Sequence, residues 1–129
     1  MQTPIIQRYT SPNMSGEPVE EKGKFLQVTW QQRSYLLFAP KDLHPYHTRL
    51  LAHFLTENSI AHRWLDEEKL EVDDPGLTVT GGGKYRITAG QTLELFDNSQ
   101  AYGRFEEQGL AEQIARSNLP WSRYDVRIL

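Results

Sequence analysis

The chain has 129 residues, of which 38% are hydrophobic and 24% are charged, and its formal net charge is −3. This length suits one domain, and the small negative charge argues against a protein that binds nucleic acid over a broad basic surface. The chain contains no cysteine, which excludes disulfides, a thiolate nucleophile and a cysteine-based zinc site. No apolar run reaches the length of a bilayer span, so we expect a soluble, cytoplasmic protein without membrane or nucleic-acid partners.

Residues 1–22 are expected to form an N-terminal tail that is partly disordered. Proline, serine, asparagine, glycine and glutamate cluster there, with too little apolar surface to offset the entropy of ordering. A short edge strand over residues 5–9 is the alternative for its first part. A single folded domain is expected over residues 23–129.

Two strands and a helix are predicted next. KFLQVTW (residues 24–30) and RSYLLFAP (residues 33–40) read as strands of a hairpin joined through two glutamines. The apolar residues then recur at helical spacing within residues 43–60. We place Pro45 at the first helical position, where its missing N–H group costs nothing.

Short strands are predicted over the next part of the chain, separated by turns rich in glycine and proline. They are HRWL (62–65), KLEV (69–72), LTVT (77–80), KYRIT (84–88) and TLELF (92–96). A second helix is predicted from Glu106 to about Ser117, with Glu106 and Glu107 at its positive end, and a last strand over residues 123–129. Together these elements predict an α+β fold, a mixed sheet of about six strands packed with two main helices.

The triple glycine at residues 81–83 has two interpretations. Glycine marks bulges and bends in a sheet, which is the ordinary structural explanation. Glycine also lets the backbone approach a ligand closely, and Lys84 would then project from the following strand onto an anion. The spacing of a Walker A loop is absent, so a nucleotide-binding P-loop is excluded.

The loop DNSQAYG (residues 97–103) is also open to two interpretations. Its Asp, Asn and Ser residues are common turn formers, so a plain connection is the default. A loop of small polar residues can instead turn successive N–H groups inward and bind a phosphate or carboxylate.

His47 is the histidine with the most informative position. It falls in the first turn of the predicted helix, over the same stripe as Leu50 and Leu51, so its ring should point toward the sheet. A helix N-terminus disfavours a positive charge, and a neutral imidazole is the state that a general base requires. The structural alternative is a core or capping histidine. The spacing of the four histidines does not predict a zinc site.

These motifs, taken in order, resemble the janus/ocnus family, whose characterised member is a phosphohistidine phosphatase. GGGK followed by two strands and SQAYG is similar to the family signature GGGR…S-x-AYG. The YH of PYHTRLL and the lysine of GKFLQV also match family positions. The resemblance runs from Lys24 to the last strand, about four-fifths of the chain. Lys84 replaces the family's arginine, and LDEEKLEVDDPG (residues 65–76) is an apparent insertion.

The resemblance implies a role for each matching residue. His47 would be the general base that activates a water molecule. The phosphoryl oxygens would be held by Ser99 and by the backbone of Gln100 and Ala101, with Gly83 in the glycine motif. Positive charge would come from two lysines, Lys24 and Lys84.

The activity implied by the resemblance is metal-independent hydrolysis of phosphohistidine or a related phosphoramidate in proteins. The fold implied is that family's sandwich, and no cofactor or metal is expected. The expected partner is a phosphohistidine-containing protein or a small phosphoramidate, and the protein is expected to be a monomer. The alternative is a module of the same fold that binds phosphate or another anion without turnover.

Overall fold

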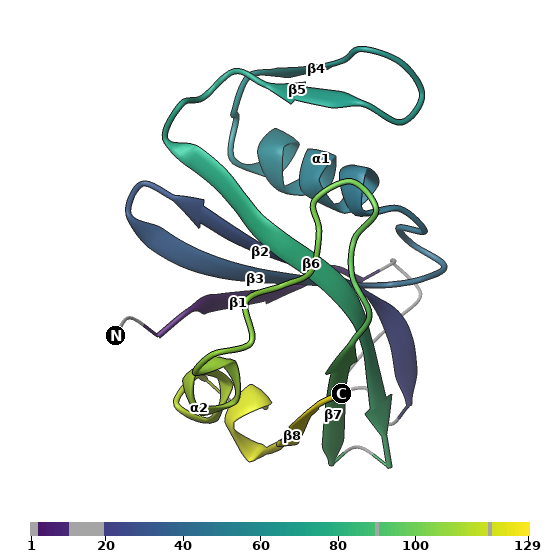
Figure 1. Ribbon diagram of the computed structural model, residues 1–129, viewed down its shortest axis with the longest axis vertical. Helices are drawn as coiled ribbons and strands as arrows, with labels where there is room; N and C mark the ends of the chain where they lie inside the picture. The colour runs from purple at the N-terminus through teal and green to yellow at the C-terminus, as the bar shows by residue number, and fades with distance from the viewer. Residues whose placement is uncertain (1–2, 11–19, 90, 119) are drawn as a thin grey trace.

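The computed structural model describes residues 3–10, 20–89, 91–118 and 120–129. The elements are β1 (Ile5–Arg8), β2 (Glu21–Trp30), β3 (Arg33–Pro40), α1 (His47–Glu57), β4 (His62–Trp64), β5 (Leu70–Val72), β6 (Leu77–Thr88), β7 (Thr92–Phe96), α2 (Leu110–Ala115), the 3₁₀ turn η1 (Trp121–Arg123) and β8 (Asp125–Ile128). Six strands form one sheet in the order β1-β3-β2-β6-β7-β8, and β4 pairs only with β5. Helices α1 and α2 lie on opposite faces of the sheet (Figure 1). The predicted α+β fold is confirmed.

The sheet is mixed because its two outermost strands are parallel to their neighbours. β1 runs parallel to β3 and β8 runs parallel to β7, whereas the four central strands are antiparallel. The hairpin of β2 and β3 turns through Gln31 and Gln32, as predicted. Both glutamines have positive φ, 52° and 63°, which is the backbone of a tight turn that matches the twist of the strands.

Alternation along β2 separates two hydrophobic cores. Phe25 belongs to the core beneath α2, with Tyr85 and Ile114, while Leu26 belongs to the core beneath α1, with Phe54. Successive side chains of a strand point to opposite faces, so one strand supplies both cores. A strand in the middle of the sheet therefore carries apolar side chains on both faces.

Helix α1 begins later than predicted. Tyr46 is the N-cap and His47 the first helical residue, so Pro45 precedes the helix and does not occupy its first turn. The stripe of Leu50, Leu51, Phe54 and Leu55 is buried against the sheet, as its spacing predicts. The helix ends where the side-chain amide of Asn58 donates to the carbonyl of Phe54 (2.9 Å).

A single strand, β6, replaces the two strands predicted over residues 77–80 and 84–88. The triple glycine lies inside this strand, and its pairing with β2 shifts register so that Gln27 opposes Gly81 while Val28 opposes Val79. Thr80 is the extra residue of a β-bulge, which bends the strand without ending it. A bulge thus lies directly before the glycine motif, while the predicted break between strands is wrong.

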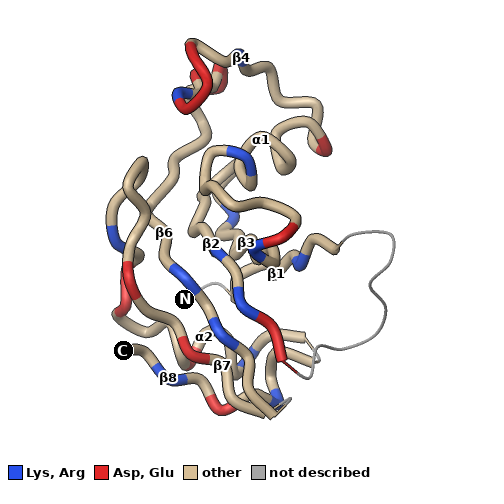
Figure 2. Tube along the Cα trace, turned by 90° about the vertical axis from the view of Figure 1, so that its right-hand side faces the viewer, with Lys and Arg blue, Asp and Glu red and all other residues tan. Residues whose placement is uncertain are grey.

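The predicted strands 62–65 and 69–72 exist as β4 and β5, but they form a separate ribbon outside the main sheet. Leu70 and Val72 pack against the core that contains α1, and the Arg49 guanidinium lies 4.6 Å from the centre of the Trp64 ring. Figure 1 shows this ribbon on the side of α1 away from the sheet. Its acidic residues, in the loop 66–68, lie at that end of the molecule (Figure 2).

The C-terminal elements are shorter than predicted. Helix α2 begins at Leu110, after the N-cap Gly109 with φ 75°, so Glu106 and Glu107 do not lie in its first turn. The backbone N–H of Glu106 instead bonds the side chain of Gln27 at 2.6 Å. Gly109 supplies the left-handed backbone directly before the helix, a conformation that glycine adopts without strain. Neither described helix has the length and apolarity of a membrane span.

Part of the predicted tail belongs to the sheet. Residues 5–8 form the edge strand β1, which was the alternative for this segment, and β2 begins at Glu21. Residues 1–2 and 11–19 of the tail lie outside the described residues. Arg8 makes a two-point ion pair with Glu21 (2.6 and 3.1 Å), and the Tyr85 hydroxyl donates to the same carboxylate at 2.5 Å. Because the Glu21 side chain is only 4% exposed, this network fastens the edge strand to the sheet.

Glu21→Gln should lower the free energy of unfolding by about 2 kcal/mol, because it removes the negative partner of a largely buried guanidinium. Glu71→Gln is the matched control, since the Arg63–Glu71 pair is 71% and 48% exposed and should change stability by less than about 0.5 kcal/mol. Urea unfolding of both variants measures the difference. Equal changes in the free energy of unfolding would show that the buried Arg8–Glu21 pair stabilises the protein no more than an exposed pair does.

Candidate functional site

His47 is held between α1 and β6. Its ring is buried, with 6% of the residue exposed, and Nε2 lies 2.9 Å from the carbonyl oxygen of Gly83. A carbonyl only accepts hydrogen bonds, so Nε2 must carry the proton. In a neutral ring, Nδ1 is then the nitrogen with the free electron pair. The backbone of β6 thereby fixes which nitrogen can accept a proton.

The glycines of β6 make room for this contact. A Cβ atom on Gly82 would lie 3.0 Å from Cδ2 of His47 and 2.7 Å from the carbonyl oxygen of Phe25. A Cβ on Gly83 would lie 2.6 Å from the carbonyl oxygen of Phe96. Distances this short require the backbone to move. The triple glycine is therefore explained by close packing around the imidazole and the neighbouring strand.

The pKa of His47 is lowered from its ordinary value of 6.5. Burial is the largest cause, because the charged imidazolium loses its hydration, and the hydrogen bond to the Gly83 carbonyl opposes the shift. The nearby charges of Lys24 and Lys84 lower the pKa further, while Asp97 raises it. The ring is thus neutral near pH 7, as expected from its position in the sequence.

Lys24 and Lys84 face each other across the antiparallel pair of β2 and β6. The pKa of Lys24 is lowered, first by burial and then by the charge of Lys84. Two like charges directly opposite one another destabilise a sheet unless an anion lies between them. The pairing indicates a position where a bound anion would relieve repulsion.

Asp97 already supplies one negative charge at this position. Its carboxylate lies 3.0 Å from the ammonium of Lys84, and its pKa is lowered, chiefly by that contact. Asp97 has φ 64°, and its carbonyl oxygen accepts from the guanidinium of Arg104 at 2.8 Å. The sequence predicts Asp97 only as a turn former, so this ion pair is a feature that the sequence pattern did not reveal. A clue was present in the predicted hairpin of residues 84–88 and 92–96. Lys84 pairs with Phe96 there, and Asp97 is the residue that follows Phe96.

The loop after β7 is closed by its own hydrogen bonds. Ser99 is buried, its N–H donates to the Gly103 carbonyl at 3.1 Å, and its hydroxyl oxygen accepts from the N–H of Tyr102 at 3.1 Å. Gln100 and Ala101 form the exposed tip. Their N–H groups have no hydrogen-bond partner among the described residues. Of the three predicted phosphate-binding positions in this loop, two therefore present free amides, while the N–H of Ser99 is used to shape the loop.

The loop and His47 lie on either side of the same glycine. The N–H of Gly82 donates to the Gly103 carbonyl at 3.0 Å, and the Cα of Gly82 faces the His47 ring closely enough to exclude a side chain. Figure 1 shows the loop rising in front of β6 toward α1. The structure thus brings His47, Gly83, Lys24 and Lys84 together, with the Ser99 loop beside them.

A pocket of about 390 Å³ opens next to these residues. Lys24, Lys84, Pro45 and Phe96 are among the residues that line it, whereas His47 and the Ser99 loop border it without lining it. No residue of the β4–β5 ribbon lines it, so the acidic insertion does not border the pocket. Among the described residues no group of three or more histidine, aspartate or glutamate side chains is arranged to hold a metal ion.

The other three histidines have partners of their own. Nε2 of His44 is 2.7 Å from Nδ1 of His53, and the Tyr9 ring stacks on His53 with centroids 4.0 Å apart. His62 is on β4, where Nδ1 lies 2.7 Å from the Ile60 carbonyl and so donates to it. Within the described part of the chain, His47 alone of the four histidines contacts the glycine motif.

Comparison of the chain with protein-family models and with curated proteins finds no match.

His47 should titrate below pH 6.5 in the folded protein, because burial disfavours its charged form. The contribution of the neutral His47 ring to the free energy of unfolding is then fully present above pH 6.5, and it is lost as the pH falls below that value. Nitrogen NMR of the imidazole should show the proton of the neutral ring on Nε2. Lys24→Gln should raise the midpoint while leaving it below 6.5, and Lys69→Gln, on the ribbon loop, should not move it. A midpoint at or above 6.5 in the parent protein would contradict this.

Asp97→Asn should strengthen the binding of inorganic phosphate about two- to fivefold, because it releases the ammonium of Lys84 from an exposed ion pair. Calorimetric or NMR titration measures the affinity. Asp125→Asn is the control, since Asp125 pairs with Arg127 at 3.1 Å on an exposed strand and should leave the affinity unchanged. An unchanged affinity in Asp97→Asn would mean that phosphate does not use Lys84.

Proposed function

We propose that the protein is a metal-independent phosphatase that hydrolyses phosphohistidine, or a related phosphoramidate, in proteins. The observation that supports this most is the buried His47, whose Nε2 is committed to the Gly83 carbonyl at 2.9 Å beside two facing lysines. This arrangement supplies a neutral base and a positive field at one place. The order of the YH, GGGK and SQAYG motifs, which resembles that of the janus/ocnus family, adds independent support.

In the proposed reaction His47 activates water. Nδ1 takes a proton from the water molecule as its oxygen attacks phosphorus, and the P–N bond breaks with its electron pair moving to the leaving nitrogen. That nitrogen then takes up a proton, and the imidazolium releases its own to solvent, which restores the neutral ring. A positioned general base typically contributes about 10²–10⁴-fold to the rate.

The remaining groups would stabilise the phosphoryl group during transfer. Phosphoryl transfer depends mainly on positioning and on neutralising charge at the three equatorial oxygens. The ammonium groups of Lys24 and Lys84 and the free N–H groups of Gln100 and Ala101 are the donors available. Lys84 would exchange the carboxylate of Asp97 for a phosphoryl oxygen. A lysine gives one point charge here, whereas the family's arginine gives a planar two-point contact.

The second candidate is an anion-binding module without turnover. The observation that favours it is the Lys84–Asp97 ion pair of 3.0 Å, because the carboxylate already occupies the lysine and would compete with a substrate. Such a module would bind phosphate at the loop tip and leave the P–N bond intact. The acidic insertion, which also motivated this alternative, gives it less support because it does not border the pocket.

Hydrolysis of a phosphohistidine peptide in the presence of EDTA tests the proposal. His47→Gln and His47→Ala should lose about 10²–10⁴-fold in kcat, because the general base is removed. His62→Gln is the matched control, a histidine on the ribbon with its own backbone hydrogen bond, and should keep full activity. NMR spectra of the variants check that they fold.

Two results would overturn the assignment. Unchanged turnover in both His47 variants would remove the residue from its role. A parent protein without turnover, but with phosphate-dependent amide shifts at Gln100 and Ala101, would establish the anion-binding module.

A further inference from the structure

The positive charge beside His47 extends beyond the two lysines of the proposed phosphoryl site. The pocket of about 390 Å³ is also lined by Lys22, Lys41 and Arg86. Lys22 lies opposite Arg86 in the β2–β6 pairing, two pairs along from Lys24 and Lys84. Basic residues lie next to each other on β2 and β6 in Figure 2. The pocket thus has a second group of cations that the proposed hydrolysis does not use.

These cations differ in their existing partners. Arg86 bonds the Glu94 carboxylate at 2.6 Å and lies 5.5 Å from the centre of the Phe96 ring. Lys22 and Lys41 take part in none of the ion pairs within residues 3–10, 20–89, 91–118 and 120–129. Two ammonium groups at the pocket are therefore without an ion pair among those residues, although Glu20 and Asp42 line an adjoining cavity with them.

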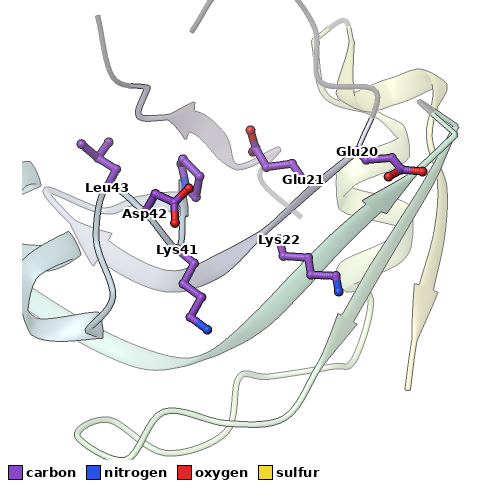
Figure 3. A pocket seen from close by; sticks show the side chains of 7 residues that line it. Glu20, Glu21, Lys22, Lys41, Asp42 and Leu43 are labelled. Carbon is purple, nitrogen blue, oxygen red and sulfur yellow. The ribbon is translucent and has the colours of Figure 1, made fainter. Parts of the chain in front are cut away.

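The backbone holds these two lysines side by side. The N–H of Lys41, just after β3, donates to the carbonyl of Lys22 on β2 at 3.0 Å. Figure 3 shows the adjoining cavity, which both lysines also line: their side chains point to the same side, while the carboxylate of Glu21 points to the other. Glu21 is bound there by Arg8 and Tyr85. The buried network therefore keeps the Glu21 carboxylate away from the two ammonium groups.

The spacing fits a chain that binds in an extended conformation. Lys22 and Lys24 are two residues apart on one strand, which places them roughly 7 Å apart on one face. Side chains two residues apart in an extended peptide have the same spacing. If the phosphorylated side chain of a bound peptide lies at Lys24, the peptide side chain two residues away would therefore lie at Lys22 and Lys41.

We propose that Lys22 and Lys41 form a second anion subsite, which selects phosphorylated segments carrying an aspartate or glutamate two residues from the phosphorylated residue. This inference rests on the proposed function, because it takes the site at His47 and Lys24 as the position of the phosphoryl group. Lys22 and Lys41 are specificity residues that contact the substrate away from the reacting atoms. Complementary charge is the recognition chemistry, and rising ionic strength weakens it.

The test compares phosphohistidine peptides that have aspartate or asparagine two residues before, or two residues after, the phosphorylated histidine. The parent protein should prefer one aspartate peptide over its asparagine partner about three- to tenfold in kcat/KM, the range for one or two partly exposed ion pairs. The preference should appear mainly in KM and should shrink as salt is added. The double variant Lys22→Gln/Lys41→Gln should lose this preference, so that kcat/KM is about equal for the aspartate and asparagine peptides. The asparagine peptide should be hydrolysed as fast as by the parent protein.

Two controls separate charge from structure. Lys22→Arg/Lys41→Arg should keep the preference, and Lys69→Gln/Arg127→Gln, which removes two charges outside the pocket, should also keep it. Equal kcat/KM for aspartate and asparagine peptides in the parent protein would overturn the subsite while leaving the phosphatase proposal intact.

Binding distinguishes failure of the subsite from failure of the enzyme. If no peptide is hydrolysed, the same four peptides made with a stable phosphohistidine analogue are titrated and their dissociation constants compared. A preference for aspartate that the double glutamine variant loses would support the subsite without the enzyme. Equal dissociation constants would refute it.

Discussion

The hydrogen bond from Nε2 of His47 to the carbonyl of Gly83 is the constraint on which the candidate site depends. It joins the first residue of α1 to the middle of β6, and it decides which imidazole nitrogen can accept a proton. The contact needs a strand without a side chain at Gly82, because any Cβ there would press on the ring. The glycine at position 82 is therefore a packing requirement for one buried histidine.

The electrostatics of the site follow from where this ring lies. Burial and two neighbouring lysines disfavour the imidazolium, so the ring stays neutral while the surface around it is positive. A single aspartate, Asp97, reduces that field by pairing with Lys84. The site at rest thus holds an internal carboxylate where the proposed reaction places a phosphoryl oxygen, and binding becomes an exchange of one anion for another.

The fold keeps the acidic loop of the ribbon away from the basic pocket. The β4–β5 ribbon carries the acidic loop 66–68 on the far side of α1, whereas the basic residues lie on the face of β2 and β6 beyond the start of that helix (Figure 2). Glu21 is the carboxylate nearest in sequence to Lys22, and it is turned to the other side and bound by Arg8. A chain with a net negative charge can therefore present a positive pocket.

The sequence alone determined the fold class, the β2–β3 hairpin, the buried stripe of α1 and the inward position of His47, because these depend on local periodicity and turn chemistry. It did not determine that β6 continues through the glycines, that α2 begins only at Leu110, or that Asp97 pairs with Lys84. Those features depend on contacts between residues distant along the chain. Gly81–Gly83 meet Phe25, His47 and Arg104 only after the sheet has formed. Local pattern fixes which face of an element is buried, but only packing decides which groups meet there.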